Sequence, residues 1–264
     1  QVLPTRRERI AVEGFTADPV GDSASRAGHG LLHKYARRVL VVTTGACSIH
    51  CRYCFRREFP YAEQAVSGAR LGPALATIAA DPTIKEVILS GGDPLVLGTP
   101  TLTRIVRGIE GIGHVTRLRL HTRVPTTLPS RLADPALIAL LCAWRGGLVV
   151  VMHANHPAEI CAQTVRAVSR LRGAGALVLN QSVLLAGVND HADVLVSLSE
   201  ALFDAGVMPY YLHLLDPVDG AAHFEVDAAR VHALKTALEN HLPGYLVPTL
   251  VREAPGAAAK TRLA

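Results

Sequence analysis

Three cysteines stand close together in the segment ACSIHCRYCFRREFPY, residues 46–61, where Cys47, Cys51 and Cys54 form the pattern CxxxCxxC. Three thiolates can hold three irons of a [4Fe-4S] cluster and leave the fourth iron without a protein ligand, whereas an electron-transfer cluster is ordinarily held by four cysteines. An open iron indicates a cluster that does chemistry. A zinc site that takes nearby His50 as its fourth ligand, or three free thiols, is the alternative.

The elements that must position these thiols follow a regular pattern. Apolar, β-branched runs are expected to be strands, and amphipathic stretches between them to be helices. The strands are expected at 39–43, 86–90, 117–122, 148–153, 177–184 and 208–215, and the helices at 72–80, 100–111, 135–144, 158–174, 192–205 and 228–242. From the second strand on they repeat about every thirty residues, the length of one βα unit.

Six βα units imply a parallel sheet with right-handed crossovers, and they are too few for a closed eight-stranded barrel. We therefore predict an α/β fold, an incomplete (βα)6 TIM-like barrel, in preference to a closed barrel or a flat doubly wound sheet. The chain is expected to form a single domain over 1–264, with a lead-in at 1–38, the partial barrel at 39–242 and a tail at 243–264.

Polar residues gather where these strands end, which is where parallel α/β folds place their chemistry. We expect one shared rim of polar residues there: Cys47, Gly91, Gly92, Asp93, His121, Arg123, His153, Asn155, His156, Asn180, Gln181, His213 and Asp216. Cys142 and Cys161 lie on expected helices, apart from this rim, and are interpreted as small buried hydrophobes.

Composition narrows the class of protein. The chain is 49% hydrophobic and 19% charged, which is typical of an ordered globular protein. Its net charge of +5 comes with scattered arginines and no nucleic-acid recognition motif, so we expect no nucleic-acid partner. No apolar run reaches membrane-spanning length, and the cysteine count is odd, so a reducing cytoplasm without membrane contact is expected.

The CxxxCxxC motif after the first barrel strand resembles the signature of the radical S-adenosylmethionine superfamily. Tyr53, before the last cysteine, and the turn SGGD at Ser90, Gly91, Gly92 and Asp93 also resemble that superfamily. The resemblance implies a radical S-adenosylmethionine core in which the open iron binds the sulfonium. We assign Tyr53, the four turn residues, His121, Asn180 and Gln181 to cofactor binding.

A longer set of motifs resembles the lysine 2,3-aminomutase family from about Asp18 to Leu263: GLLHKYARRVL, CRYCFRREFPY, LSGGDPL, HTRVP, HANHPAEI, NQSVLLAGVND and YYLHLLDPVDGAAHF. The resemblance implies an isomerase that moves the amino group of L-lysine from carbon 2 to carbon 3. It also implies pyridoxal 5'-phosphate, bound to a lysine as a Schiff base.

The sequence has four lysines, and Lys260 occupies the family's Schiff-base position. Lys85 belongs at the opposite face of the barrel, Lys235 lies inside the last expected helix, and Lys34 precedes the first strand. The alternative for Lys260 is a mobile terminal lysine. For the coenzyme's phosphate the resemblance implies Lys34, Tyr35 and Arg38, with Lys34 standing where the classical enzyme has an arginine.

The resemblance also implies how the substrate is held. Arg56 takes the carboxylate of lysine, and a planar guanidinium suits that pairing. Asp216 and Glu253 take the ε-ammonium. The enzymes that act on free lysine have aspartate where Glu253 stands, which reshapes the pocket by about one methylene.

The chain is most similar to the short branch of the family that makes (R)-β-lysine for elongation factor P. It ends at Ala264, has no cysteine after Cys161, and has His191 where a cysteine follows in the free-lysine enzymes. The implied partners are L-lysine, a reductant such as flavodoxin or ferredoxin, and elongation factor P with its lysyl-ligase. The alternatives are a free-lysine aminomutase of metabolism, a radical enzyme without pyridoxal phosphate, and a metal-stabilised binding module.

Overall fold

One sheet of nine strands runs through the computed structural model, which describes residues 1–28, 30–66 and 68–263. The strands lie side by side in chain order, and β2 to β8 are parallel, with β1 and β9 antiparallel at the two edges. Their bounds are β1 Leu31–Tyr35, β2 Arg38–Thr44, β3 Glu86–Gly91, β4 Arg117–Thr122, β5 Gly147–Met152, β6 Leu177–Val183, β7 Met208–His213, β8 Thr249–Arg252 and β9 Thr261–Arg262.

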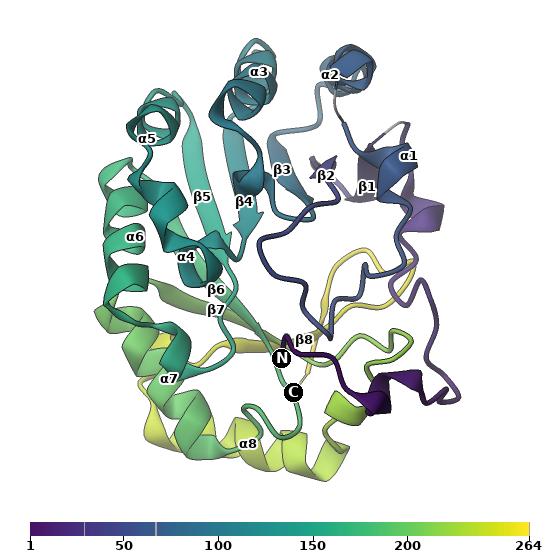
Figure 1. Cartoon of the computed structure of the whole chain (residues 1–264), viewed down its shortest axis with the longest axis vertical. Coiled ribbons are helices and arrows are strands. Elements are labelled where there is room, and N and C mark those ends of the chain that lie inside the picture. Colours follow the sequence, from purple (N-terminus) through teal and green to yellow (C-terminus); the bar gives the residue numbers. More distant parts are fainter. Residues whose placement is uncertain (29, 67, 264) are drawn as a thin grey trace.

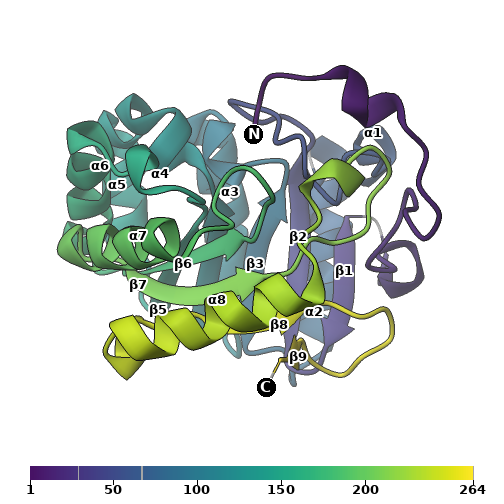
Figure 2. The ribbon, with the colours of Figure 1, turned by 90° about the horizontal axis from the view of Figure 1, so that it is seen from below.

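The helices cover the outer side of this curved sheet, and the other side of the arc is open (Figure 1). A helix of eight or more residues follows each strand from β2 to β7, so these crossovers are βα units. The α-helices are α1 Tyr61–Gln64, α2 Leu71–Ala80, α3 Thr99–Glu110, α4 Val124–Thr127, α5 Pro135–Cys142, α6 Ala162–Gly173, α7 Ala192–Asp204 and α8 Ala228–His241. Figure 2 shows α8 running along β7 and β8, where Val231, Leu234 and Leu238 pack on Leu212 and Leu250.

The predicted incomplete barrel is confirmed, and its six expected strands are β2 to β7. Strands β1, β8 and β9 were not predicted. The hairpin from β1 to β2 turns at Arg37, which has a φ of 65°. The two-residue β9 carries no periodic signal at all, because an alternation needs about four residues to be read.

Side chains alternate between a dry outer face and a polar inner face. On β4, Leu118 and Leu120 are fully buried in the core under the helices, whereas Arg119 and His121 point inward. Arg119, near the start of β4, forms an ion pair with Glu86, the first residue of β3, and Nη2 of Arg119 lies 2.6 Å from Oε2 of Glu86. This ion pair occupies the amino-terminal end of the interior and leaves the carboxyl ends of the strands for chemistry.

The two cysteines outside the CxxxCxxC segment were predicted to be buried, and they are not. Cys142 ends α5 and Cys161 caps α6, and both are exposed. The prediction was wrong because apolar character does not reveal which side of a terminal turn faces the core. No helix among the described residues has both the length and the apolar character to cross a membrane.

Candidate active site

The loop after β2 carries Cys47, Cys51 and Cys54, and the turn after β3 fixes where that loop begins. Gly92 donates its N–H to the carbonyl of Thr44 at 2.6 Å, and Asp93 donates to the carbonyl of Ala46 at 2.8 Å. A Cβ at Gly92 would lie 2.2 Å from the carbonyl oxygen of Ala46, so only glycine permits this approach. The SGGD turn therefore supports the cysteine loop directly.

The three thiols lie on this loop and are half-buried. Burial, Asp93 and the other two thiols raise the pKa of Cys47 to about 12, because the three sulfurs lie close enough to interact electrostatically. Within the described ranges, no three side chains of the metal-ligating types are arranged as a finished metal site. Sγ of Cys51 instead accepts a hydrogen bond from Nη1 of Arg123 at 2.9 Å. A set of three thiols on one short loop suits an iron-sulfur cluster, and their ligand role stays a prediction.

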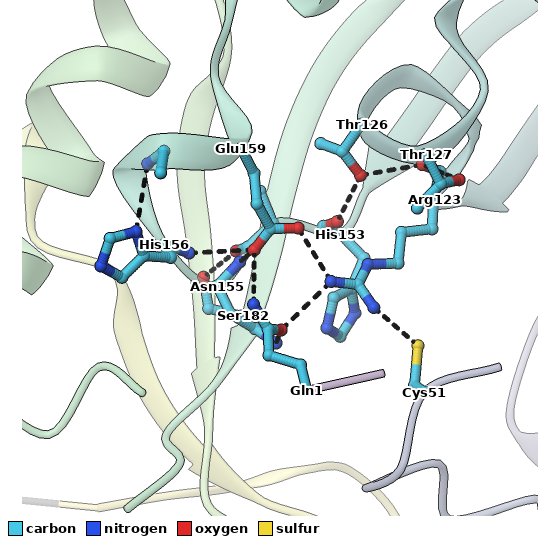
Figure 3. Close-up of polar contacts among 12 residues, drawn as sticks. Gln1, Cys51, Arg123, Thr126, Thr127, His153, Asn155, His156, Glu159 and Ser182 are labelled. Atoms are coloured by element: carbon cyan, nitrogen blue, oxygen red, sulfur yellow. Dashed lines mark hydrogen bonds and ion pairs between the residues drawn. The ribbon is translucent and has the colours of Figure 1, made fainter. Parts of the chain in front are cut away.

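Arg123 is oriented by an acidic residue that the sequence did not single out. Figure 3 shows its guanidinium between Cys51 and Glu159, whose Oε2 accepts from Nη2 at 2.8 Å. The other oxygen of Glu159 accepts the backbone N–H groups of Asn155 and His156 at 2.9 and 3.1 Å. This carboxylate therefore ties the loop after β5 to the cysteine loop through Arg123.

Tyr53 joins the same two loops. Its ring is buried, and its hydroxyl accepts from Nδ2 of Asn155 at 2.7 Å and lies 3.0 Å from Nε2 of His153. Burial and Arg123 lower the pKa of His153 to about 3, which keeps the imidazole neutral. The predicted cofactor contact of Tyr53 stays a prediction, since these contacts are structural.

The side chains of two residues assigned to cofactor binding, Asp93 and Asn180, make hydrogen bonds to other groups of the protein. Asp93 accepts hydrogen bonds from the backbone of Leu95 and Arg123 and from Oγ1 of Thr122, at 2.7 to 3.0 Å. Asn180 bonds both backbone groups of Ala154 and lines a small gap against α7, on the helix side of the sheet. Consecutive strand residues face opposite sides, so Asn180 and Gln181 cannot both point inward.

Gln181 and two histidines occupy the inner face instead. Gln181 is half-buried, and its amide makes no side-chain hydrogen bond to the described residues. His121 on β4 and His213 on β7 each have a buried Nε2 without a partner among the described residues. Burial and Lys260 lower the pKa of His213 to about 3, and burial, Arg119 and Lys260 lower that of His121, so both rings are neutral and near the Lys260 amine.

A chain of five alternating charges crosses the open side of the barrel. Lys260 donates to Oε2 of Glu253, and Oε1 of Glu253 lies 3.0 Å from Nζ of Lys34. Lys34 in turn lies 2.7 Å from Oδ1 of Asp22, whose Oδ2 accepts from Nε of Arg56 at 2.6 Å. The tail, β1, the lead-in and the cysteine loop thus meet at one cluster, and Asp22 had not been predicted.

Charge pairing sets the ionisation of this cluster. Burial would raise the pKa of Glu253, but Lys260 and Lys34 hold it at about 2. Asp216, after β7, behaves oppositely, because burial and the charge of Glu253 raise its pKa to about 7. Lys260, Lys34 and Arg56 moderate that rise, because their positive charges lie near Asp216.

The residues expected at the phosphate differ in how free they are. Nζ of Lys34 donates to Glu253 and to the carbonyl of Val20 at 2.8 Å and lies in an ion pair with Asp22, so three protein oxygens already surround it. Arg38 has no acidic partner within 4.0 Å among the described residues, and its guanidinium lies 4.6 Å above the Tyr35 ring. Burial and Glu253 raise the pKa of Tyr35, so its phenol stays protonated.

Comparison with known proteins places the chain among named enzymes. Residues 28–120 match the model of the 4Fe-4S single cluster domain family. The chain is 44% identical to L-lysine 2,3-aminomutase of Escherichia coli strain K12, over 100% of this chain and 76% of that protein. It is 43% identical to the L-lysine 2,3-aminomutase of Haemophilus influenzae, over 99% of this chain and 77% of that protein.

More distant relatives agree. The L-lysine 2,3-aminomutase of Clostridium subterminale is 36% identical over 99% of this chain and 62% of that protein. Among solved structures, a radical SAM methyltransferase from Sphaerobacter thermophilus aligns over 84% of this chain and 68% of that one, with a TM-score of 0.56 and 19% identity. At that identity the match supports the fold alone.

Proposed function

The chain belongs to the L-lysine 2,3-aminomutase family, and from this premise we propose that it moves the amino group of L-lysine from carbon 2 to carbon 3. The observation that carries the proposal is the meeting of Arg56, Asp216, Glu253 and Lys260 in one charged cluster. A lysine substrate has one carboxylate and one distal ammonium, and this cluster offers one guanidinium and two carboxyl groups to them.

This function implies three groups, and the residues present fit two of them, a [4Fe-4S] cluster and pyridoxal phosphate. The loop thiols suit the cluster. Lys260, with the unpartnered nitrogens of His121 and His213 near it, suits the coenzyme, and Arg38 over the Tyr35 ring suits its phosphate. When bound, the cluster with S-adenosylmethionine supplies a carbon-centred radical, and the pyridine ring supplies an electron sink.

The protein's own part is to bind and orient. We assign Arg56 to the substrate carboxylate, Asp216 and Glu253 to the ammonium, and Lys260 to covalent attachment of the coenzyme. Arg38 and Tyr35 are assigned to the phosphate. Lys34 is assigned to holding Glu253 and Asp22 rather than to the phosphate, because these two carboxylates and the carbonyl of Val20 already surround its Nζ.

The site also excludes water from the reacting atoms. Arg56 and Asp22 are nearly inaccessible, with exposed side-chain fractions of 10% and 2%, and Tyr53 on the cysteine loop is buried. A radical in such a place meets few competing donors, and every charge acts in a low-dielectric environment.

We further propose that the product is (R)-β-lysine for elongation factor P, attached by a lysyl-ligase, and that flavodoxin or ferredoxin supplies the electron. Glu253, which differs from the aspartate expected in free-lysine enzymes, supports this branch. Incubating the product with the ligase and elongation factor P tests it. A product that the ligase does not attach, but that accumulates freely, would assign the enzyme to free-lysine metabolism.

The reaction itself is tested by anaerobic reconstitution with iron, sulfide, pyridoxal phosphate, S-adenosylmethionine and a reductant, followed by chromatography of the lysine isomers. We expect β-lysine to form, and to be absent when pyridoxal phosphate or S-adenosylmethionine is omitted. Cleavage of S-adenosylmethionine without β-lysine would instead favour a radical enzyme that lacks the coenzyme.

A further inference from the structure

Asp22 lies at the centre of the charged cluster, although it belongs to the lead-in before the barrel. It is 1% exposed, and its two oxygens meet two different cations, Arg56 at 2.6 Å and Lys34 at 2.7 Å. The backbone around it is held by Asp18, whose carboxylate accepts from the N–H groups of Asp22 and Ser23 at 2.8 and 2.9 Å. The lead-in therefore presents one carboxylate at a fixed position.

The ionisation of Asp22 follows from this position. Burial alone would raise its pKa, but Arg56 and Lys34 hold the pKa below the ordinary value of an aspartate. A buried carboxylate is costly unless it is paired, and both oxygens of Asp22 are paired. The charge is therefore permanent at neutral pH and can orient its neighbours.

What Asp22 does to Arg56 is specific in geometry. It uses only Nε, and the two terminal nitrogens of Arg56 make no hydrogen bond or ion pair to the described residues. A guanidinium is planar, so an anchor at Nε fixes the direction in which the terminal N–H groups point. Cation–π contact with Phe55, 4.7 Å from the ring centre, supports the same plane.

We infer that Asp22 is a positioning residue that makes the site selective for an amino acid with a free α-carboxylate, by aiming the terminal N–H groups of Arg56 at that carboxylate. The inference rests on the proposed function, in which Arg56 binds the substrate carboxylate. Asp22 itself touches neither substrate nor cofactor. Its effect on binding passes through Arg56 and is confined to ligands that carry the carboxylate.

Two ligands separate this role from a merely structural one. L-Lysine carries the α-carboxylate, whereas 1,5-diaminopentane has the same amines and lacks it. Binding to the reconstituted protein is measured by titration calorimetry for the wild type and for Asp22→Asn. We expect Asp22→Asn to weaken lysine at least tenfold and the diamine less than twofold, and KM for lysine to rise more than kcat falls.

A double-mutant cycle and a conservative variant complete the experiment. In an Arg56→Gln background, adding Asp22→Asn should weaken lysine binding little further, because Arg56, through which Asp22 acts, is already replaced. Asp22→Glu keeps the charge and serves if the asparagine variant does not fold. It should weaken lysine less than Asp22→Asn and leave the diamine unchanged.

The outcomes distinguish the two proposals. Equal weakening of lysine and diamine by Asp22→Asn, or full additivity with Arg56→Gln, would overturn the positioning role while β-lysine formation by the wild type still stands. A wild type that binds neither ligand and makes no β-lysine would overturn the proposed function, and the inference with it.

Discussion

Lys260 donates a hydrogen bond from Nζ to Oε2 of Glu253, seven residues earlier in the chain. The pair holds the tail amine in the charged cluster, because a charged amine paired with a buried carboxylate is costly to separate. In the proposed site Lys260 would hold the coenzyme covalently and would no longer donate to Glu253 as a free ammonium. The oxygen of Glu253 that Lys260 occupies here would then be available to a substrate ammonium.

Replacing Lys260 with alanine should abolish attachment of the coenzyme. The variant is expected to lose the visible absorbance of protein-bound pyridoxal phosphate and to keep the iron content of the wild type, since no thiol is touched. Lys235→Ala is the matched control, because Lys235 pairs with Glu239 on α8, which covers the outer side of the sheet. Absorbance that survives in Lys260→Ala and disappears in Lys34→Ala would move the attachment to the other amine on Glu253.

Lysine affinity should depend on pH through Asp216, whose pKa is raised to about 7. In the proposed site the ammonium is bound by the ionised carboxylate, so affinity should be full well above pH 7 and fall up to tenfold per pH unit below it. His213, with a pKa of about 3, does not titrate in this range. Calorimetric titration between pH 5 and 8 measures the effect.

Asp216→Asn provides the control for that profile. Without the carboxyl group the affinity should be lower at pH 8 and nearly independent of pH. A variant that retains the wild-type slope would show that another group titrates, and a flat profile in the wild type would contradict the assignment of Asp216.

Asp93 is predicted to stabilise the folded protein even when no cofactor is bound. Its carboxylate satisfies donors from Leu95, Thr122 and Arg123, and Asp93→Asn places an amide against some of them, at a cost of about 2 kcal/mol in the free energy of unfolding. Urea unfolding of the metal-free protein measures it. Asp81→Asn is the control, because Asp81 accepts two comparable hydrogen bonds from Thr83 at the surface and should change stability much less. Unchanged stability with lost S-adenosylmethionine binding would instead support a cofactor contact.

The sequence located the strands well because each buried strand combines an apolar run with a following turn. It located functional residues less well where the role of a residue depends on which face of the sheet its side chain points to. Asn180 and Gln181 look equivalent in sequence, yet the alternation of the strand sends one to the helices and the other inward. Asp22 and Glu159 gave no signal, because their partners Arg56 and Arg123 lie 34 and 36 residues away and only the fold brings them together.

Arg123 is expected to tune the cluster that the three cysteines are predicted to hold. Its hydrogen bond to Cys51 and its positive charge both stabilise the extra negative charge of a reduced cluster. Arg123→Gln should therefore lower the midpoint potential by roughly 60 mV, a tenfold change for one electron. Arg123→Lys keeps the charge but loses the planar guanidinium geometry that Glu159 holds. Its midpoint potential should lie between those of the wild type and Arg123→Gln. The measurement is a redox titration followed by electron paramagnetic resonance, with iron content determined for each variant. A potential unchanged in Arg123→Gln at full iron content would mean that Cys51 turns away from Arg123 once iron is bound.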